Sequence, residues 1–304
     1  MSLRFCRRPT WWNSNLPYTN ADIEKPEQVE CEIGGNKFTS YAAVTKDGKD
    51  VICGRVTSVL KDAIGFGDNF VDWAVNQTLD FLRSKIKAFE EYSPAELTKI
   101  FGDGEKARYH VAEEAAEYGT RVHELIEMYT HNGAFTYVTD GEEFEIDIEK
   151  EAEPVRNGVK AFLDFWHREG LKPVEIEVWL VCVELGIGGT LDLVARDKAN
   201  DLVLIDHKTS KAVRDKYLLQ VGYYDMLWDA AKAYLPWPHF NERIKRAYIL
   251  RLDKATADFE VFPVFRDEAE RAALRDQCLA TLKTYRWLRE TGKILSKFSK
   301  KGKV

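Results

Sequence analysis

Two aspartates and a lysine in the middle of the chain are of the residue types that bind metal and phosphate. Asp192 follows the run Gly-Gly-Thr-Leu, and one residue separates Asp206 from Lys208. Neighbouring carboxylates supply the oxygen ligands that Mg²⁺ or Mn²⁺ prefers, and an ammonium beside them offsets negative charge. Hydrolysis of a phosphodiester requires this combination. We therefore expect a cation-dependent hydrolytic site that contains these three residues.

A β-hairpin is the element expected to position them. The ranges 189–196 and 202–209 are largely apolar and flank a polar turn. Side chains two apart on a strand share a face. Asp206 and Lys208 should therefore point the same way, and His207 should point the other way.

On the first strand, the same alternation places Thr190 and Asp192 on one face, opposite Leu191 and Leu193. If the polar faces of the two strands pair, Asp192 converges with Asp206 and the lysine lies at the rim. The alternative is that the second aspartate and its lysine form an ion pair with only a structural role, because charged strand faces are often simply solvated.

A helix expected from 214 to 234 carries two further candidates. Gln220 and Tyr224 are four residues apart and so share a helix face. Gln220 can hydrogen-bond a phosphate, a metal-bound water or a carboxylate ligand, and Tyr224 can do the same or stack on a base. The alternative is that the tyrosine belongs to the apolar core face of this helix.

A long helix-prone run from 113 to 130 places Gly119, His123 and Glu127 on one face, because they too are four apart. The imidazole of His123 can reach a cation held by the hairpin. The alternative is a partly buried histidine bonded to a carboxylate. For Glu127, a ligand role competes with simple exposure to water.

These motifs, in this order, resemble the PD-(D/E)xK nuclease superfamily and, within it, the RecB-type nuclease domain. The helical run from Gly119 looks like that family's first motif, G-x-x-x-H-x-x-x-E, and Glu177 looks like its acidic residue on the strand before the hairpin. The matches to the two metal-binding motifs and to the helical Q-x-x-x-Y motif are Asp192, Asp206, His207, Lys208, Gln220 and Tyr224. Segment 54–60 and the helix that bears Trp73 are similar to phage and mitochondrial-type single-strand DNA exonucleases of this group.

The resemblance implies an α/β fold with a restriction-endonuclease-like core, in which helices flank a mixed central β-sheet. We expect this nuclease core over 101–292, an N-terminal β/α extension over 1–100 that packs on or caps it, and a basic flexible tail over 293–304. We expect the extension to contain a small antiparallel element at 28–54.

The implied activity is that of a Mg²⁺-dependent deoxyribonuclease, an exonuclease acting on single strands or free ends of DNA in replication, recombination or repair. One or two ions of Mg²⁺ or Mn²⁺ would be held by Asp192, Asp206 and the carbonyl of His207. Glu177 and one of His123 or Glu127 would complete the set. Lys208 would orient or deprotonate the attacking water.

Nucleic-acid contacts are expected from Thr120, Lys211, Arg214 and Trp73. RNA stays open as a substrate, because metal-assisted cleavage tolerates a 2′-hydroxyl. A recombination or replication protein is an expected partner. Two alternatives are a structure-specific or nicking endonuclease with the same active site and a catalytically weak nucleic-acid-binding module.

The amino-acid composition limits the classes of protein to which the chain can belong. The chain has 304 residues, 45% of them hydrophobic, and a formal net charge of −6, which is unlike a protein that coats DNA nonspecifically. Five cysteines, none in a C-x-x-C pair, argue against a disulfide framework and against an iron–sulfur cluster. We expect no signal peptide, no transmembrane segment and no membrane partner. The expected location is a reducing cytoplasm, or the host cytoplasm if the chain is phage-encoded.

The remaining elements follow from periodicity and capping. Ser93-Pro94-Ala95-Glu96 has capping-box spacing and should begin a helix that precedes the one carrying His123. Other helices are expected over about 70–89, 148–169 and 266–290, a hairpin or loop over 133–147, and strands over 174–184, 246–252 and 258–265.

Overall fold

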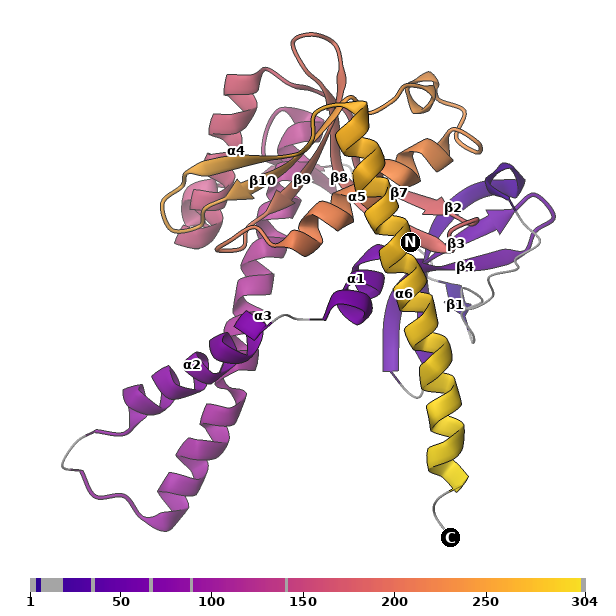
Figure 1. Ribbon diagram of the computed structural model, residues 1–304. Helices are drawn as coiled ribbons and strands as arrows, with labels where there is room; N and C mark the ends of the chain where they lie inside the picture. Colours follow the sequence, from indigo (N-terminus) through magenta and orange to yellow (C-terminus); the bar gives the residue numbers. More distant parts are fainter. Residues whose placement is uncertain are drawn as a thin grey trace.

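A mixed β-sheet flanked by helices carries the fold in a computed structural model of the chain (Figure 1). The residues that the structure describes are 4–6, 19–33, 36–65, 68–87, 90–139 and 142–301. Among them, nine strands form one sheet in the order β1-β2-β3-β4-β8-β9-β10-β11, with β7 paired to β8 beside this path. This is the architecture that the sequence predicted.

The central strands reproduce the expected hairpin. β7 (Lys172–Cys182), β8 (Ile187–Arg196) and β9 (Leu202–Lys208) pair antiparallel in that order. β10 (Arg246–Leu252) lies parallel to β9, and β11 (Phe259–Phe265) pairs antiparallel with β10. The strands predicted over 246–252 and 258–265 are thereby confirmed.

The N-terminal strands extend the same sheet. Their bounds are Arg4–Cys6 for β1, Ile23–Ile33 for β2, Asn36–Thr45 for β3 and Asp50–Arg55 for β4. β4 lies parallel to β8, with Gly54 opposite Ile187 and Arg55 opposite Gly188. The expected antiparallel element at 28–54 therefore joins the central sheet edge to edge at β8.

Helices cover both faces of the central strands. On one face, α5 (Asp215–Ala231) and α6 (Glu268–Lys301) enclose a core that includes Leu204, Val221 and Leu282. On the other face, α4 (Glu153–Glu169) and the second half of α3 (Pro94–Asn132) enclose a core that includes Val122, Phe162 and Ile205. Burial of these apolar side chains is the main force that holds the helices on the sheet.

α3 is one continuous helix of 39 residues, whereas the sequence predicted two successive helices. Its start is as predicted: the Ser93 hydroxyl accepts from the Glu96 N–H, and the Glu96 carboxylate accepts from the Ser93 N–H. The glycines inside it do not end it. A Cβ at Gly104 would lie 3.0 Å from Leu82, so that glycine permits close packing of α2 (Asp68–Lys85).

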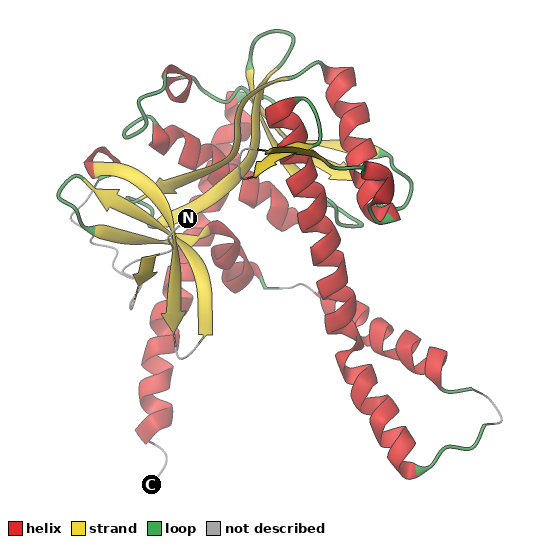
Figure 2. Cartoon of the chain, turned by 180° about the vertical axis from the view of Figure 1, so that it is seen from behind, coloured by secondary structure: helices red, strands yellow, loops and turns green. Residues whose placement is uncertain are grey.

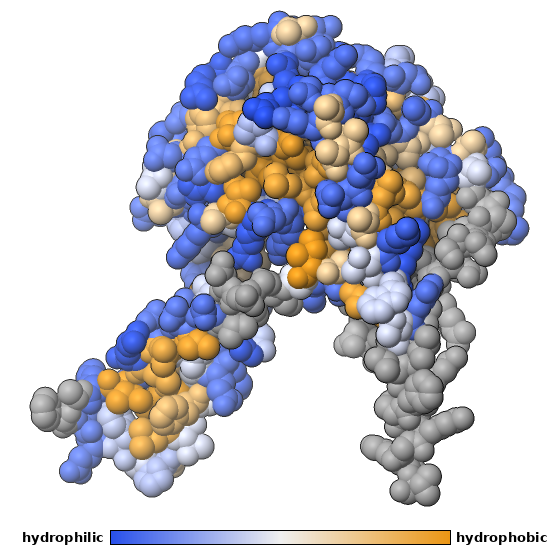
Figure 3. Space-filling view, in the orientation of Figure 1, coloured by the Kyte–Doolittle hydropathy of each residue, from blue (hydrophilic) through white to orange (hydrophobic). Residues whose placement is uncertain are grey.

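α2 and the first part of α3 form an arm that projects from the sheet, as Figures 1 and 2 show from opposite sides. Apolar residues gather on this arm in the space-filling view (Figure 3). Val75, Leu79, Phe101 and Tyr109 are among its exposed large side chains. In the described residues, no helix is long and apolar enough to cross a membrane.

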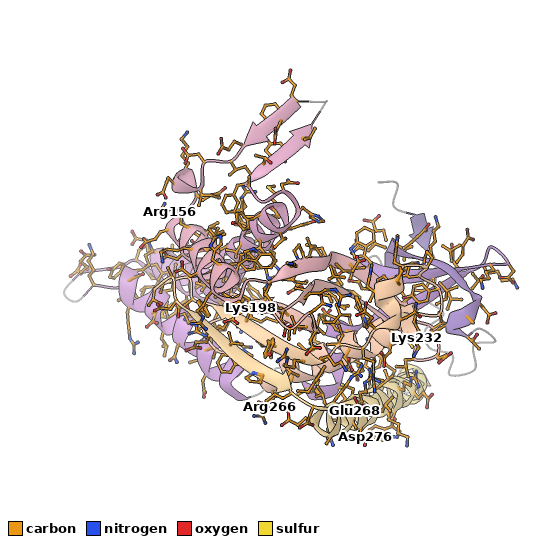
Figure 4. The ribbon with its side chains drawn as sticks, turned by 90° about the horizontal axis from the view of Figure 1, so that it is seen from above. Arg156, Lys198, Lys232, Arg266, Glu268 and Asp276 are labelled. Carbon is orange, nitrogen blue, oxygen red and sulfur yellow. The ribbon has the colours of Figure 1, made fainter. Side chains whose placement is uncertain are left out.

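The remaining segments differ from expectation in detail. The 148–169 segment begins with the 3₁₀ turn Ile148–Lys150 before α4 starts at Glu153. The 133–147 segment forms a two-stranded hairpin of β5 (Thr136–Thr139) and β6 (Glu142–Glu145), which stands out from the molecule in Figure 4. α6 runs to Lys301, so helix continues through most of the segment expected to be a flexible tail. The other elements are α1 (Val56–Ile64) and the 3₁₀ turns Asn20–Asp22 and Pro238–Asn241.

A buried ion-pair network fixes α6 on α5. The Arg271 guanidinium donates to both carboxylate oxygens of Asp225, and Arg275 donates to Asp225 and Asp229. Arg271 and Asp225 are almost fully buried. Loss of either charge would leave the other with fewer partners in the core, so the network helps to hold α6 in one position against α5.

Candidate metal centre

Asp206 and Lys208 form the first part of the centre. Their side chains lie on the same side of β9, as predicted, and this is the side that α5 covers. The Lys208 ammonium lies 2.5 Å from Asp206 Oδ2. Asp206 is fully buried, and Lys208 has 15% of its side chain exposed. The ammonium also donates to the carbonyl of His207 at 3.2 Å. The carbonyl expected to bind a cation is therefore a neighbour of the lysine.

Asp192 joins this group through the backbone of the next strand. Its Oδ2 accepts the main-chain N–H of His207 at 2.7 Å. Asp192 is 9% exposed. This hydrogen bond places the Asp192 carboxylate between the two faces of the sheet, where it interacts electrostatically with Lys208 and with His123.

The β7–β8 pair is irregular where Asp192 lies. Glu177, opposite it, has a φ of 47°, in the left-handed region that non-glycine residues rarely adopt. Leu191 packs in the core beneath α5, whereas Leu193 packs in the core beneath α3 and α4. The prediction that these two leucines share a face is therefore wrong, because simple alternation fails at this kink. Such strained backbone is concentrated at functional sites.

The kink directs two carboxylates toward α3. His123 Nδ1 lies 3.8 Å from Glu177 Oε1 and 3.9 Å from Asp192 Oδ2. Burial alone would lower the pKa of His123, but the charges of Asp192 and Glu177 outweigh it, and the pKa is raised. The histidine predicted from the helical motif thus lies beside the two acids with which it was expected to act.

The two aspartates of the centre titrate differently. Burial, augmented by the charge of Asp192, raises the pKa of Asp206 to about 6 even though Lys208 opposes the shift. The pKa of Asp192 is lowered, since the charges of His123 and Lys208 and the His207 N–H outweigh its burial. The pKa of Lys208 is raised, because its burial is outweighed by Asp206 and Asp192. At neutral pH the centre therefore contains two carboxylates and an ammonium.

Gln220 and Tyr224 complete the α5 side of the centre. The Gln220 amide nitrogen lies 3.3 Å from Asp206 Oδ1 and 2.8 Å from the Tyr224 hydroxyl. Burial raises the pKa of Tyr224 well above its ordinary value, so the phenol is neutral. Both residues therefore lie at the centre, and Tyr224 is at the same time part of the core. A Cβ at Gly189 would lie 2.7 Å from the Tyr224 ring, so only glycine allows this packing.

A sequence model of the PD-(D/E)XK nuclease superfamily matches residues 101–293. The chain belongs to this superfamily. The match spans the acidic hairpin, the helix with Gln220 and Tyr224, and the part of α3 that bears His123. A search of curated proteins found no match.

Nucleases of this superfamily use divalent metal ions, and the residues of the centre fit one. One carboxylate oxygen of Asp192 and one imidazole nitrogen each from His123 and His207 lie within 4.8 Å of one another. His207 Nε2 is buried without a hydrogen-bond partner. A neutral imidazole and an ionised carboxylate are good ligands for a divalent cation.

Two hollows of the nuclease adjoin the centre. The larger has a volume of about 480 Å³, and His123, Glu177, Glu127 and Thr120 are among its lining residues. The smaller, of about 180 Å³, is lined in part by Asp192, Tyr224 and Arg55. Glu127 and Thr120 thus lie near the centre, as their place in the helical motif suggested.

The other three residues predicted to contact nucleic acid lie farther out. Lys211 and Arg214 are exposed in the segment between β9 and α5. Trp73 is on α2, which packs on α3 in the projecting arm. The roles of these three residues remain predictions.

Part of the surroundings of the centre was not predicted from the sequence. Tyr41 of β3 shares a hydrogen bond of 2.9 Å with the Thr190 hydroxyl, and Arg55 ends β4 beside Gly188. These residues reach the nuclease centre through the pairing of β4 with β8. The imidazole of His207 was also missed, because its position between Asp206 and Lys208 points it to the opposite face.

Proposed function

We propose that this nuclease is a Mg²⁺- or Mn²⁺-dependent DNA exonuclease that acts on single strands or free ends. The observation that carries the proposal is the linked group of Asp192, Asp206 and Lys208, two carboxylates and an ammonium held on adjacent strands. A divalent cation held by Asp192 and Asp206 would lower the pKa of a water ligand and polarise the scissile phosphate. The acids required to hold such a cation are together in one place.

The protein's own groups have distinct roles in this proposal. Asp192 and Asp206 supply carboxylate oxygens, with Glu177 and His123 on the α3 side. Lys208 offsets charge on the transition state and orients or deprotonates the attacking water, because its ammonium lies 2.5 Å from Asp206 Oδ2, beside the place proposed for the ion.

The Gln220 amide nitrogen contacts both Asp206 and the Tyr224 hydroxyl, and so positions the Asp206 carboxylate. Thr120, lining the larger hollow, and the exposed Lys211 and Arg214 are proposed to contact the phosphate backbone. Trp73 on the arm is proposed to stack on a base farther along the strand. A role in replication, recombination or repair, with a protein of those processes as partner, completes the proposal.

The test uses end-labelled linear DNA and the same sequence as a covalently closed circle, single-stranded and double-stranded. Wild-type protein should degrade the linear single strand with Mg²⁺ or Mn²⁺, should leave the circle intact, and should be inactive with EDTA. Asp206→Ala purified in parallel reports contaminating nuclease. Nicking or cutting of the circle by the wild type alone would establish the endonuclease alternative. Binding without cutting would establish the non-catalytic one.

A further inference from the structure

The imidazole of His207 lies on the opposite side of β9 from Asp206 and Lys208. Its ring packs edge-on against Phe162 of α4, with centroids 5.3 Å apart. The ring of His123 from α3 lies 5.8 Å away, also edge-on. His207 is 2% exposed. A histidine is thus enclosed between the sheet and two helices, directly behind the acidic pair.

One ring nitrogen of His207 is unsatisfied. Nε2 is buried and has no hydrogen-bond partner. A buried polar atom without a partner costs free energy, and native proteins rarely retain one without a reason. An aromatic or aliphatic side chain would fill the same space against Phe162 without this cost. A ligand role explains why a nitrogen-bearing ring is here.

The neighbours of His207 form a donor set with it. An imidazole nitrogen of His123, one of His207 and a carboxylate oxygen of Asp192 lie within 4.8 Å of one another. Two ligand atoms that each bind an ion at roughly 2.1 Å are at most about 4.2 Å apart. His123 Nδ1 and Asp192 Oδ2, at 3.9 Å, already meet this limit. The other two donor pairs exceed this limit by at most about 0.6 Å.

We propose that the His207 side chain is a metal ligand which, with His123 and Asp192, forms a two-nitrogen, one-oxygen site for a borderline divalent cation. The class of ion is Mn²⁺, Co²⁺ or Zn²⁺ rather than Mg²⁺, because imidazole suits transition metals and Mg²⁺ requires oxygen ligands. The inference rests on the metal centre of the proposed function and specifies which ion that centre prefers.

The site differs from the acidic group in front of it. Asp206 and Lys208 face α5, whereas the His207 ring faces α4 and the His123 ring of α3. Asp192 belongs to both groups, because its Oδ2 accepts the His207 N–H while the carboxylate also faces His123. Removing the His207 ring should therefore change the ion preference and leave Asp206, Lys208 and Gln220 in place.

The test is metal binding by the full chain, measured without DNA. Co²⁺, Mn²⁺ and Mg²⁺ are titrated by calorimetry into the wild type, His207→Phe and His207→Gln. His110→Gln, on the exposed part of α3, is the matched control. Proton NMR of the Co²⁺-loaded protein reports each coordinated imidazole as a separate, strongly shifted exchangeable N–H signal. Circular dichroism and the melting temperature verify folding, and the phenylalanine variant preserves the ring packing against Phe162.

We expect the wild type and the control to bind Co²⁺ more tightly than Mg²⁺ and to show two shifted imidazole signals. Both His207 variants should lose about tenfold or more in Co²⁺ affinity and one signal, with little change for Mg²⁺. A folded His207→Phe variant that keeps the wild-type ratio of Co²⁺ to Mg²⁺ affinity, or both signals, overturns the proposal. His207-dependent Co²⁺ binding by a protein that cuts no DNA would sustain this inference and refute the proposed function. If the protein cleaves DNA but both His207 variants bind Co²⁺ as tightly as the wild type, the proposed function is supported and this inference is refuted.

Discussion

Asp192 Oδ2 and the main-chain N–H of His207 are joined by a hydrogen bond of 2.7 Å that crosses from β8 to β9. This bond places a β8 carboxylate beside the Asp206–Lys208 pair of β9. It also holds the backbone of the residue whose ring faces His123. The Asp192 side chain thus adds to the backbone pairing of β8 with β9, and we expect it to serve both structure and chemistry.

The two roles of Asp192 can be separated by substitution. Asp192→Asn keeps an oxygen that accepts the His207 N–H but loses the negative charge. We expect the variant to fold with a melting temperature near that of the wild type and to bind divalent ions far more weakly. Asp192→Leu should lose both properties, because a buried N–H is left without an acceptor, at a cost of about 1–3 kcal/mol. Thermal unfolding measures the stability of both variants, and calorimetry measures their metal affinity. A well-folded Asp192→Asn variant that binds metal as tightly as the wild type would contradict the ligand role.

Gln220 and Asp206 should differ in the size of their effects. Gln220 positions the Asp206 carboxylate through a contact of 3.3 Å, whereas Asp206 itself is proposed to bind the ion. Gln220→Ala should therefore reduce turnover less than Asp206→Ala does, because a positioning contact is easier to lose than a cation ligand. Single-turnover cleavage rates at saturating metal provide the comparison. The reverse order would show that the two roles are exchanged.

His207 should make the metal-free protein sensitive to acid. Burial lowers the pKa of His207 to about 3, whereas the unfolded chain has the ordinary value near 6.5. Between these two pKa values, His207 is therefore protonated in the unfolded state and neutral in the folded state. This contribution to stability is fully present above pH 6.5 and is lost at about 1.4 kcal/mol per pH unit as the pH falls from 6.5 toward 3.

Replacement of the ring isolates this contribution. Urea unfolding in EDTA at several pH values should show a shallower loss of stability toward acid for His207→Phe than for the wild type, because the other titrating groups are common to both. Parallel curves for the two proteins would mean that His207 is protonated as readily in the folded state as in the unfolded one.

Gly189 should be intolerant of a side chain. A Cβ there would lie 2.7 Å from a Tyr224 ring carbon, and the ring is enclosed in the core. Gly189→Ala should destabilise the protein by about 1–3 kcal/mol and reduce turnover by displacing the tyrosine that Gln220 contacts. Gly102→Ala is the control: nothing lies within 4 Å of its Cβ position, and alanine favours a helix by up to about 1 kcal/mol. Equal melting temperatures for the two variants would contradict the packing argument.

Local spacing was sufficient to predict the elements that carry the chemistry. The alternation around Asp206 predicted a strand with His207 on its reverse face, and the four-residue spacing of Gln220 and Tyr224 predicted a shared helix face. Both are properties of neighbouring residues along one chain segment. The motif order then predicted the superfamily, which the sequence match confirms at that level.

Contacts between distant segments account for what the sequence did not predict. Glu177, opposite Asp192, adopts a left-handed φ, and the alternation of side chains along β8 is interrupted at this point, so that Leu191 and Leu193 enter different cores. The pairing of β4 with β8, which brings Tyr41 and Arg55 to the centre, joins residues far apart in the chain. No local periodicity encodes either relation.

The lysine provides the most direct test of the central claim, that Asp192 and Asp206 hold a divalent cation beside the ammonium of Lys208 for phosphodiester cleavage. The measurement is the single-turnover cleavage rate of end-labelled single-stranded DNA at saturating Mg²⁺ by Lys208→Ala. Lys232→Ala, an exposed lysine at the end of α5, is the matched control, and Mg²⁺ affinity is measured on the same samples. We predict a rate loss of about a hundredfold or more for Lys208→Ala, as for removal of other transition-state charge contacts, with Mg²⁺ still bound and the control unaffected. Wild-type cleavage by a folded Lys208→Ala would contradict the account.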